Sequence, residues 1–461
     1  MKRPFSRAGL AAAILTVGCA LGSTCWAQAG SDTPQSQASL PASGGLVPFS
    51  DGFALHGQTT VVDQGHDAFT SPYQGANSLT PKASGRETWD ATLFAGVRPW
   101  TGAELWINPE IDQGFGLDGT LGVAGFPSGE AYKVGRAIPY FRLQRFFLRQ
   151  TLDLGGSPAK VDADLNQFAQ NDTANRLVFT FGKFAVTDVF DNNKYAHNPK
   201  GDFLNWSVID AGTFDYAADS WGYSAGGAVE WYQGRWALRG GAFLLSNVPN
   251  SPYLDTRFSQ FQLVGEAEER HTLWGETGRV LLTGFLSRGR MGRYSDAVAL
   301  AIAHGGRADT ALVRHYASRP GVSLDVEQQV SKDLGAFLRL GWANGAYETY
   351  EFSDIDGSAS GGLSLTGTRW GRAGDVVGLA GVVNVASGAL QTYLAAGGLG
   401  VLVGDGRLPH PGTERILEAY YDLAVIKGSD VALDYQWIAN PGYNQDRGPV
   451  SLLSVRLHAQ F

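Results

Sequence analysis

The chain has 461 residues, a formal net charge of −8 and a mean hydropathy of −0.12. The acidic balance argues against a nucleic-acid-binding protein, which needs a basic face. After the N-terminal segment there is no run of about eighteen apolar residues, which argues against helical membrane spans. Glycine (61 residues) and aromatic residues (11%) are abundant, and this composition is typical of many short strands joined by tight turns.

The N-terminal segment has the three parts of a secretory signal peptide. Its basic start is formed by three cations, Lys2, Arg3 and Arg7. Residues 10–21 form a short apolar core, and small residues then favour cleavage after Ala27 or Ala29. The apolar run is too short for a membrane-spanning helix. We therefore expect residues 1–27 to be a signal peptide that is removed on export.

Removal of this segment changes the chemistry of the exported chain. Because it takes away three cations and no acid, the formal charge becomes −11. Both cysteines, Cys19 and Cys25, are also lost, so disulfides and thiolate sites are excluded. A lipoprotein-type cleavage at Cys19 is the alternative, and Thr16 fits it poorly. Residues 28–50 are small, polar and rich in Pro, Gly and Ser, which predicts a flexible periplasmic leader.

From Phe53 onward, apolar and polar residues alternate with a period of two, as in strands that have one apolar face. In 449–461, for example, Leu453 lies on one face and Arg456 on the other. We expect residues 51–461 to form an all-β domain. Sixteen segments show the pattern: 53–62, 88–98, 100–108, 138–152, 176–187, 221–232, 235–246, 257–268, 276–287, 321–331, 335–344, 361–370, 375–385, 413–426, 429–438 and 449–461.

The connections between these segments predict a transmembrane antiparallel β-barrel. Single-chain bacterial barrels have an even number of strands, and a seventeenth candidate, 207–217, would break that parity. The short links fall on one side: 99–100, 233–234, 332–333, 372–374 and 427–429. The long links fall on the other: 63–87, 109–137, 188–220, 288–320, 345–360 and 386–412. Short periplasmic turns and long extracellular loops are typical of outer-membrane barrels. The long 153–175 link is an exception on the short side.

Phe461 closes the last alternating segment with an aromatic residue. Outer-membrane barrels characteristically end this way, and the residue predicts recognition of the last strand by the barrel-assembly machinery. No face of the predicted barrel stands out as poor in lipid contact, so the sequence does not separate a monomer from a homo-oligomer.

Five long, irregular stretches resemble the carbohydrate-selective porin family (OprB type). They are 57–79, 182–205, 221–247, 393–408 and 435–450. The resemblance extends from about residue 53 to Phe461. It implies a sixteen-stranded channel, surrounded by the outer-membrane lipid of a Gram-negative bacterium, through which glucose and related small sugars diffuse passively.

Alternation directs charged strand residues into the predicted lumen. The candidates for contact with a sugar are Arg98, Glu104, Arg142, Glu230, Arg239, Glu418 and Asp434. Charged groups match sugar hydroxyls, and inward aromatic residues such as Trp106 and Tyr420 match apolar ring faces. The alternative for each residue is a hydrated wall in which opposite charges neutralise one another. Acids outnumber bases in the inward set, which favours neutral solutes or cations over anions.

Arg142, Arg145 and Arg149 belong to one predicted strand but do not share one period-two face. All three point inward only if a bulge interrupts the strand near residues 146–147. We therefore assign only Arg142 to the pore.

The 188–220 connection is the third long loop, and in many porins this loop folds inward and narrows the channel. By the family resemblance we expect such a constriction here. Its candidate sugar-binding residues are Asp191, Asn193, Lys194 and Tyr195. The alternative is an ordinary extracellular loop, which is polar because loops face water.

The sequence has three other functional interpretations: a hydrolase, a porin for another solute and a soluble binding protein. Residues 222–226 match the G-x-S-x-G elbow of serine hydrolases, but that motif needs a strand-to-helix turn and here lies in an alternating segment. No catalytic residue is therefore assigned, and the eight scattered histidines predict no metal or other cofactor. A porin for another solute and a soluble exported carbohydrate-binding β-protein remain as alternatives. The apolar stretch 297–303 predicts a small helix packed in its loop.

Overall fold

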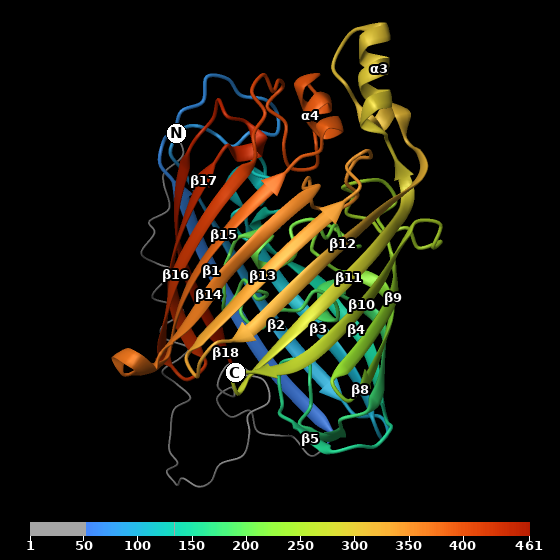
Figure 1. Cartoon of the computed structure of the whole chain (residues 1–461), viewed down its shortest axis with the longest axis vertical. Coiled ribbons are helices and arrows are strands. Elements are labelled where there is room, and N and C mark those ends of the chain that lie inside the picture. Colours follow the sequence, from blue (N-terminus) through green and yellow to red (C-terminus); the bar gives the residue numbers. More distant parts are fainter. Residues whose placement is uncertain (1–51, 133) are drawn as a thin grey trace. The chain divides into compact units, whose positions relative to one another are not determined.

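The computed structural model describes residues 52–132 and 134–461. The expected signal peptide (1–27), the expected leader (28–50) and both cysteines lie outside the described residues. Within the described part, sixteen strands form one closed antiparallel barrel in which sequence neighbours pair and β1 closes on β18 (Figure 1). The predicted strand number is thus confirmed, and the rejected candidate 207–217 contains no strand.

The elements have the following bounds. The barrel strands are β1 Phe53–His66, β2 Ser84–Val97, β3 Ala103–Gly114, β4 Arg136–Asp153, β7 Arg176–Phe184, β8 Ser224–Gln233, β9 Trp236–Leu244, β10 Phe261–Leu273, β11 Glu276–Met291, β12 His315–Gln329, β13 Leu334–Ala343, β14 Gly357–Gly367, β15 Arg372–Val385, β16 Glu414–Ile426, β17 Ser429–Ala439 and β18 Val450–Gln460. A separate hairpin consists of β5 Pro158–Val161 and β6 Gln170–Thr173. The helices are α2 Trp206–Ile209, α3 Tyr294–His304 and α4 Gly388–Ala395. The 3₁₀ turns are η1 Leu117–Gly119, η2 Val186–Asp188, η3 Thr310–Val313, η4 Thr368–Trp370 and η5 Pro441–Tyr443.

The two faces of each strand meet different surroundings, as the alternation predicts. On β18, Leu453 is 69% exposed on the outside of the barrel, whereas Arg456 on the inside is 1% exposed. An apolar outer face is stable only when hydrocarbon rather than water surrounds it, because about 25 cal/mol per Å² favours removing apolar surface from water. The buried inner face is rich in charge, and loops that carry apolar and aromatic residues fill much of the space inside the barrel.

Connection length separates the two ends of the barrel. Residues 234–235 join β8 to β9 and residues 274–275 join β10 to β11. Trp274 and Gly275 both have positive φ (56° and 83°), the geometry of the tight hairpin turn that matches strand twist. Long loops follow β1, β3 and β7 at the opposite end, together with α3 and α4 (Figure 1). The predicted asymmetry is confirmed, and the exceptional 153–175 link contains the β5–β6 hairpin.

A bulge on β4 corrects the assignment of its arginines. Asn108 of β3 pairs with Arg145, but Pro109 pairs with Leu143, so Gln144 is the extra residue. The bulge lies slightly before the expected position. Because it shifts the alternation, all three arginines bind lumen acids: Arg142 binds Asp219, Arg145 binds Asp188 and Arg149 binds Glu104. The assignment of Arg142 alone to the pore was therefore too narrow.

The predicted helix at 297–303 is present as α3. Tyr294 and Ala297 are its buried residues, and Ile302 is largely exposed, so the helix packs less tightly than expected. No helix in the described part of the chain is long and apolar enough to cross a membrane.

Candidate functional site

The third long loop, residues 185–223, crosses the lumen of the barrel. Near its start, the N–H of Asp191 donates to Glu266 of β10 (2.8 Å). Farther along, the N–H of Leu204 donates to Glu418 of β16 (2.5 Å). These two strands are far apart in the order around the barrel. The loop therefore spans the interior, and the expected inward folding is confirmed.

The second long loop, between β3 and β4, also enters the barrel. The N–H groups of Ala124 and Gly125 donate to Glu414 of β16 (3.0 and 2.8 Å). The ring of Phe126 stacks on Trp206 of the third loop, with centroids 5.0 Å apart. The two loops thus support each other inside the lumen. Sequence analysis did not anticipate this contribution, because the anchoring contacts join residues hundreds of positions apart.

On the wall formed by β8, β9 and β10, one guanidinium connects three carboxylates. Arg239 contacts Glu230 (3.0 Å), Glu266 (2.6 Å) and Glu268 (2.7 Å). Charge-assisted bonds of this kind are short and directional, so they hold the side chains in one arrangement. Because Glu266 also accepts the N–H of Asp191, the same network fixes the start of the third loop.

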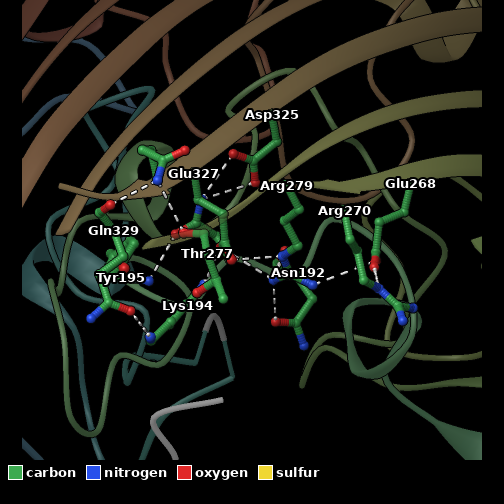
Figure 2. Close-up of polar contacts among 12 residues, drawn as sticks. Asn192, Lys194, Tyr195, Glu268, Arg270, Thr277, Arg279, Asp325, Glu327 and Gln329 are labelled. Atoms are coloured by element: carbon green, nitrogen blue, oxygen red, sulfur yellow. Dashed lines mark hydrogen bonds and ion pairs between the residues drawn. The ribbon is translucent and has the colours of Figure 1, made fainter. Parts of the chain in front are cut away.

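Beside this wall, the third loop meets β11 and β12 in a group of polar side chains that we call the lumen cluster (Figure 2). Its members are Asn192, Lys194, Tyr195, Glu268, Arg270, Arg279, Asp325, Glu327 and Gln329. Arg279 lies between loop and wall: its Nε donates to Glu327 (2.7 Å), and an Nη donates to the carbonyl oxygen of Asn192 (2.8 Å). The N–H of Lys194 also donates to Glu327 (2.6 Å), and its ammonium lies 3.4 Å from Gln329.

Within the lumen cluster, the acids lie deeper than the bases. The side chains of Glu268 and Glu327 are 2% and 9% exposed, against 16% for Arg279 and 38% for Arg270. The cationic groups therefore face the open lumen and the carboxylates stand behind them. An ammonium has three donors and a guanidinium five, so both can donate to a passing hydroxyl while keeping their structural bonds.

Tyr195 needs a glycine opposite it. A Cβ built at Gly335 of β13 would lie 2.0 Å from the Tyr195 ring, so only a residue without a side chain allows this close approach. The ring is half-buried beside Lys194, whose ammonium lies 5.4 Å from the ring centroid. An aromatic face next to a cation is a suitable surface for the apolar side of a sugar ring.

Comparison with known families decides the class of this barrel. The model of the carbohydrate-selective porin, OprB family, matches residues 76–461. The chain belongs to the OprB family. It is therefore an outer-membrane β-barrel porin of the carbohydrate-selective family, a channel and not an enzyme.

A solved porin structure agrees with this fold. OprB of Pseudomonas putida, determined at high pH, is 16% identical with a TM-score of 0.66, and the match covers 89% of this chain and 94% of that one. The outer membrane channel DcaP of Acinetobacter baumannii is 12% identical with a TM-score of 0.47, covering 89% and 97%. Comparison with curated protein sequences gives no match.

Two of the residues assigned to the pore of this OprB-family porin lie behind the third loop. Glu418 faces inward as predicted, but it is fully buried and accepts the N–H groups of Leu204 and Asn205. Asp434 is 3% exposed and accepts the side-chain amide of Gln436 (3.2 Å). Glu418 therefore supports the loop from the wall, whereas Asp434 bonds to side chains of the wall itself, and at this level of burial neither carboxylate borders the open lumen.

Two more predicted residues lie near the periplasmic end of the porin. Arg98 donates to the carbonyl oxygen of Ala169 (2.9 Å) in the long 153–175 link, and Glu104 accepts the indole N–H of Trp106 (3.0 Å). Trp106, which we expected to contact a sugar ring, points inward but is completely buried.

The remaining predicted residues lie on the third loop or on strands of the barrel wall. Arg142 lies over the Trp221 ring at 3.5 Å, with its side chain 30% exposed. Asp191 and Asn193 are buried, and the amide of Asn193 donates to Asp325 (2.8 Å). Lys194 and Tyr195 belong to the lumen cluster, and Glu230 and Arg239 form the wall beside it.

Sequence analysis missed Glu268, Arg270 and Arg279. A signal was present, because Arg279 shares the parity of the inward residues Leu281 and Thr283 on β11. Applying the alternation over the whole of 257–268 and 276–287 would have found Glu268 and Arg279, and extending the first segment by one step would have found Arg270.

The G-x-S-x-G serine has a structural bond. Ser224 begins β8 and donates its hydroxyl to the carbonyl oxygen of Leu244 (2.6 Å), and a strand follows it where a hydrolase elbow requires a helix. Among the described residues, no group of three or more His, Cys, Asp or Glu is arranged to hold a metal ion.

Proposed function

We propose that glucose and related small sugars diffuse passively through this porin along the lumen cluster, between the third loop and the β9–β12 wall. The observation that carries the proposal is the layered arrangement around Arg279. The buried Glu327 binds the partly exposed Arg279 side chain and also accepts the backbone N–H of the partly buried Lys194. Sugar hydroxyls accept from the Arg279 and Lys194 side chains, and the Tyr195 ring covers an apolar ring face.

This arrangement suits transport because each contact is shared with the protein. A side chain that already binds a carboxylate gains little from a sugar hydroxyl, so binding stays weak. A channel conducts only when its binding sites are favourable enough for a solute to enter and weak enough for the solute to leave.

The test is planar-bilayer conductance of the refolded porin, titrated with glucose and maltose. We expect stepwise channels that glucose blocks saturably. For Arg279→Ala, the half-blocking glucose concentration should rise about threefold, since a hydrogen bond shared with a carboxylate contributes only roughly 0.7 kcal/mol. Lys194→Ala should give a smaller rise.

Arg369→Ala is the matched control, because this arginine is 65% exposed beside the η4 turn and contacts only Asp333 among the described residues. Its block by glucose should equal that of the wild type. Channels that no sugar blocks would contradict the sugar site and favour a porin for another solute. Blocking unchanged in Arg279→Ala would remove the lumen cluster from the proposal.

We also propose that residues 1–27 direct export and are removed, as the N-terminal pattern predicts. Mass spectrometry of the protein from outer-membrane fractions should give an N-terminus at Gln28 or Gly30. An intact N-terminus in folded outer-membrane protein would contradict cleavage.

The last strand is our proposed recognition element for barrel assembly. Phe461 and Gly57 exchange backbone hydrogen bonds (2.9 and 3.0 Å), and the Phe461 ring covers Gly57, so this residue also completes the seam between β18 and β1. Phe461→Ala should lower the amount of folded protein in outer membranes, whereas a protein refolded from detergent should retain its conductance.

A further inference from the structure

The connection between β4 and β7 is far longer than barrel closure requires. The two strands stay paired up to Asp153 and Arg176, where two residues would be enough to turn the chain. Instead, residues 154–175 form a second hairpin on the periplasmic side, which we call the periplasmic hairpin. Its ladder runs through β5 and β6 and ends in a tight turn, where Asp164 and Gln167 exchange backbone hydrogen bonds (2.9 and 3.1 Å).

The tip of this hairpin, residues 162–169, returns into the barrel. The side-chain oxygen of Asn166 accepts from Asn108 on β3 (3.0 Å), and its carbonyl oxygen accepts from Arg149 on β4 (2.8 Å). Asn108 lies five residues above the start of β3, which is about 17 Å along the strand at about 3.4 Å per residue. The tip therefore reaches well inside the lumen.

An aromatic contact fixes the tip in that position. Phe168 is 7% exposed, its ring lies 5.1 Å from the ring of the buried Trp106, and the Arg98 guanidinium lies 4.5 Å from its centroid. On the other side, Trp106 stacks against His56 of β1 at 6.3 Å. The tip thus contacts side chains of β3 and β4 and Arg98 of the β2–β3 turn, and its aromatic partner extends the packing to β1.

We propose that the tip of the periplasmic hairpin is a second constriction, which closes the β1–β4 side of the lower lumen and limits the size of solute that leaves the channel. Its contacts are hydrogen bonds, a tilted aromatic contact and a cation over a ring, and they involve none of the residues that anchor the third loop. The size limit it imposes is therefore separate from the lumen cluster, and the proposal does not depend on the sugar site.

The test removes residues 157–173, which leaves a five-residue turn between β4 and β7. In planar bilayers, this variant should show a single-channel conductance raised about twofold, because more of the lower lumen is open to ions. Partitioning of polyethylene glycols of increasing size should show that larger polymers enter from the periplasmic side. The double variant Asn166→Ala, Phe168→Ala should change both readouts in the same direction by less.

Lys160→Ala is the matched control, because Lys160 lies on the exposed part of the hairpin and pairs only with Asp162 among the described residues. It should conduct and exclude polymers as the wild type does. Folding of each variant is checked by heat-dependent gel mobility, and if the deletion does not fold, the double variant decides. Wild-type conductance and polymer exclusion in a folded deletion or double variant would overturn the proposal.

The outcomes also separate this inference from the sugar site. A deletion that raises conductance in a channel no sugar blocks supports the second constriction and contradicts the lumen cluster. A deletion without effect, in a channel that glucose blocks, contradicts the second constriction and leaves the sugar site supported.

Discussion

At the scale of single residues, Arg339 holds the third loop to the barrel. It is 1% exposed, donates to the carbonyl oxygens of Ala196 (2.8 Å) and Val208 (2.6 Å), and binds Asp325 on the neighbouring strand (3.1 Å). Carbonyl oxygens buried inside a lumen need donors, and a guanidinium can serve several at once in fixed directions. A buried cation here orders a loop that has no regular hydrogen-bonded ladder of its own.

Arg339→Ala should destabilise the porin by about 3–5 kcal/mol, because it leaves the buried carboxylate of Asp325 without its partner. It should also make single-channel currents noisier, since three loop carbonyls, those of Asp191, Ala196 and Val208, lose their donor. Heat-dependent gel mobility measures the first effect and bilayer recording the second. Arg339→Lys keeps the charge but cannot reach all acceptors, so its effect should be intermediate. Wild-type stability and quiet channels in Arg339→Ala would contradict this role.

The odd or even position of a residue in a strand predicted whether its side chain points into the barrel, but not whether that side chain is exposed to solvent. Glu418 and Arg142 were both expected at the pore, yet the carboxylate is buried behind the third loop while the arginine side chain is 30% exposed. Parity depends only on the backbone period of two, which is local. Exposure depends on which loop comes to lie over the residue.

At the scale of elements, the β4 bulge sets the inner face of its strand. Gln144 is buried and its amide donates to Glu110 (3.0 Å), so the extra residue is itself bonded inside the lumen. Arg142 and Arg145 lie on either side of this insertion, three positions apart, and both face inward. A regular strand would direct one of them to the lipid.

Deletion of Gln144 should therefore lower the yield of folded barrel. Without the extra residue, one half of β4 exchanges its lumen and lipid faces, and an arginine of that half points into the lipid. A lipid-facing arginine at mid-membrane depth costs about 2–4 kcal/mol. The fraction folded in lipid vesicles, followed by gel mobility, measures the loss. Gln144→Ala is the control: it retains the bulge and should fold nearly as well as the wild type. Equal folding of the deletion would show that the bulge is dispensable.

At the scale of the whole molecule, the charge that is exposed to a solute in the lumen differs from the net charge of the sequence. In the two ion pairs formed by Asp219, the cations are the more exposed partners: Arg142 is 30% and Lys183 24% exposed, whereas Asp219 is 3% exposed. An ion in water interacts most strongly with the nearest unscreened charge. The sequence predicted a preference for neutral solutes or cations from the number of inward acids and bases. That number does not include how deeply each charged group is buried.

We accordingly expect a modest preference for chloride over potassium in spite of the acidic net charge. The reversal potential in a potassium chloride gradient measures this preference. Replacing both exposed cations, in Arg142→Ala with Lys183→Ala, should move the reversal potential toward that of a cation-preferring channel. A wild-type channel that already prefers potassium would contradict this account of the lumen.

Some features were determined by the sequence itself. The period of two, the short and long connections and the even strand number predicted a sixteen-stranded barrel with its apolar face outward, because strand geometry and hydrocarbon burial act locally along the chain. The five long stretches that resemble the OprB type predicted the porin family. The tertiary structure alone decided which inward residues border open lumen. The second loop, the third loop and the periplasmic hairpin fold back inside, and they cover residues such as Glu418 and Trp106. Those contacts join positions that are distant in the chain, so no local pattern encodes them.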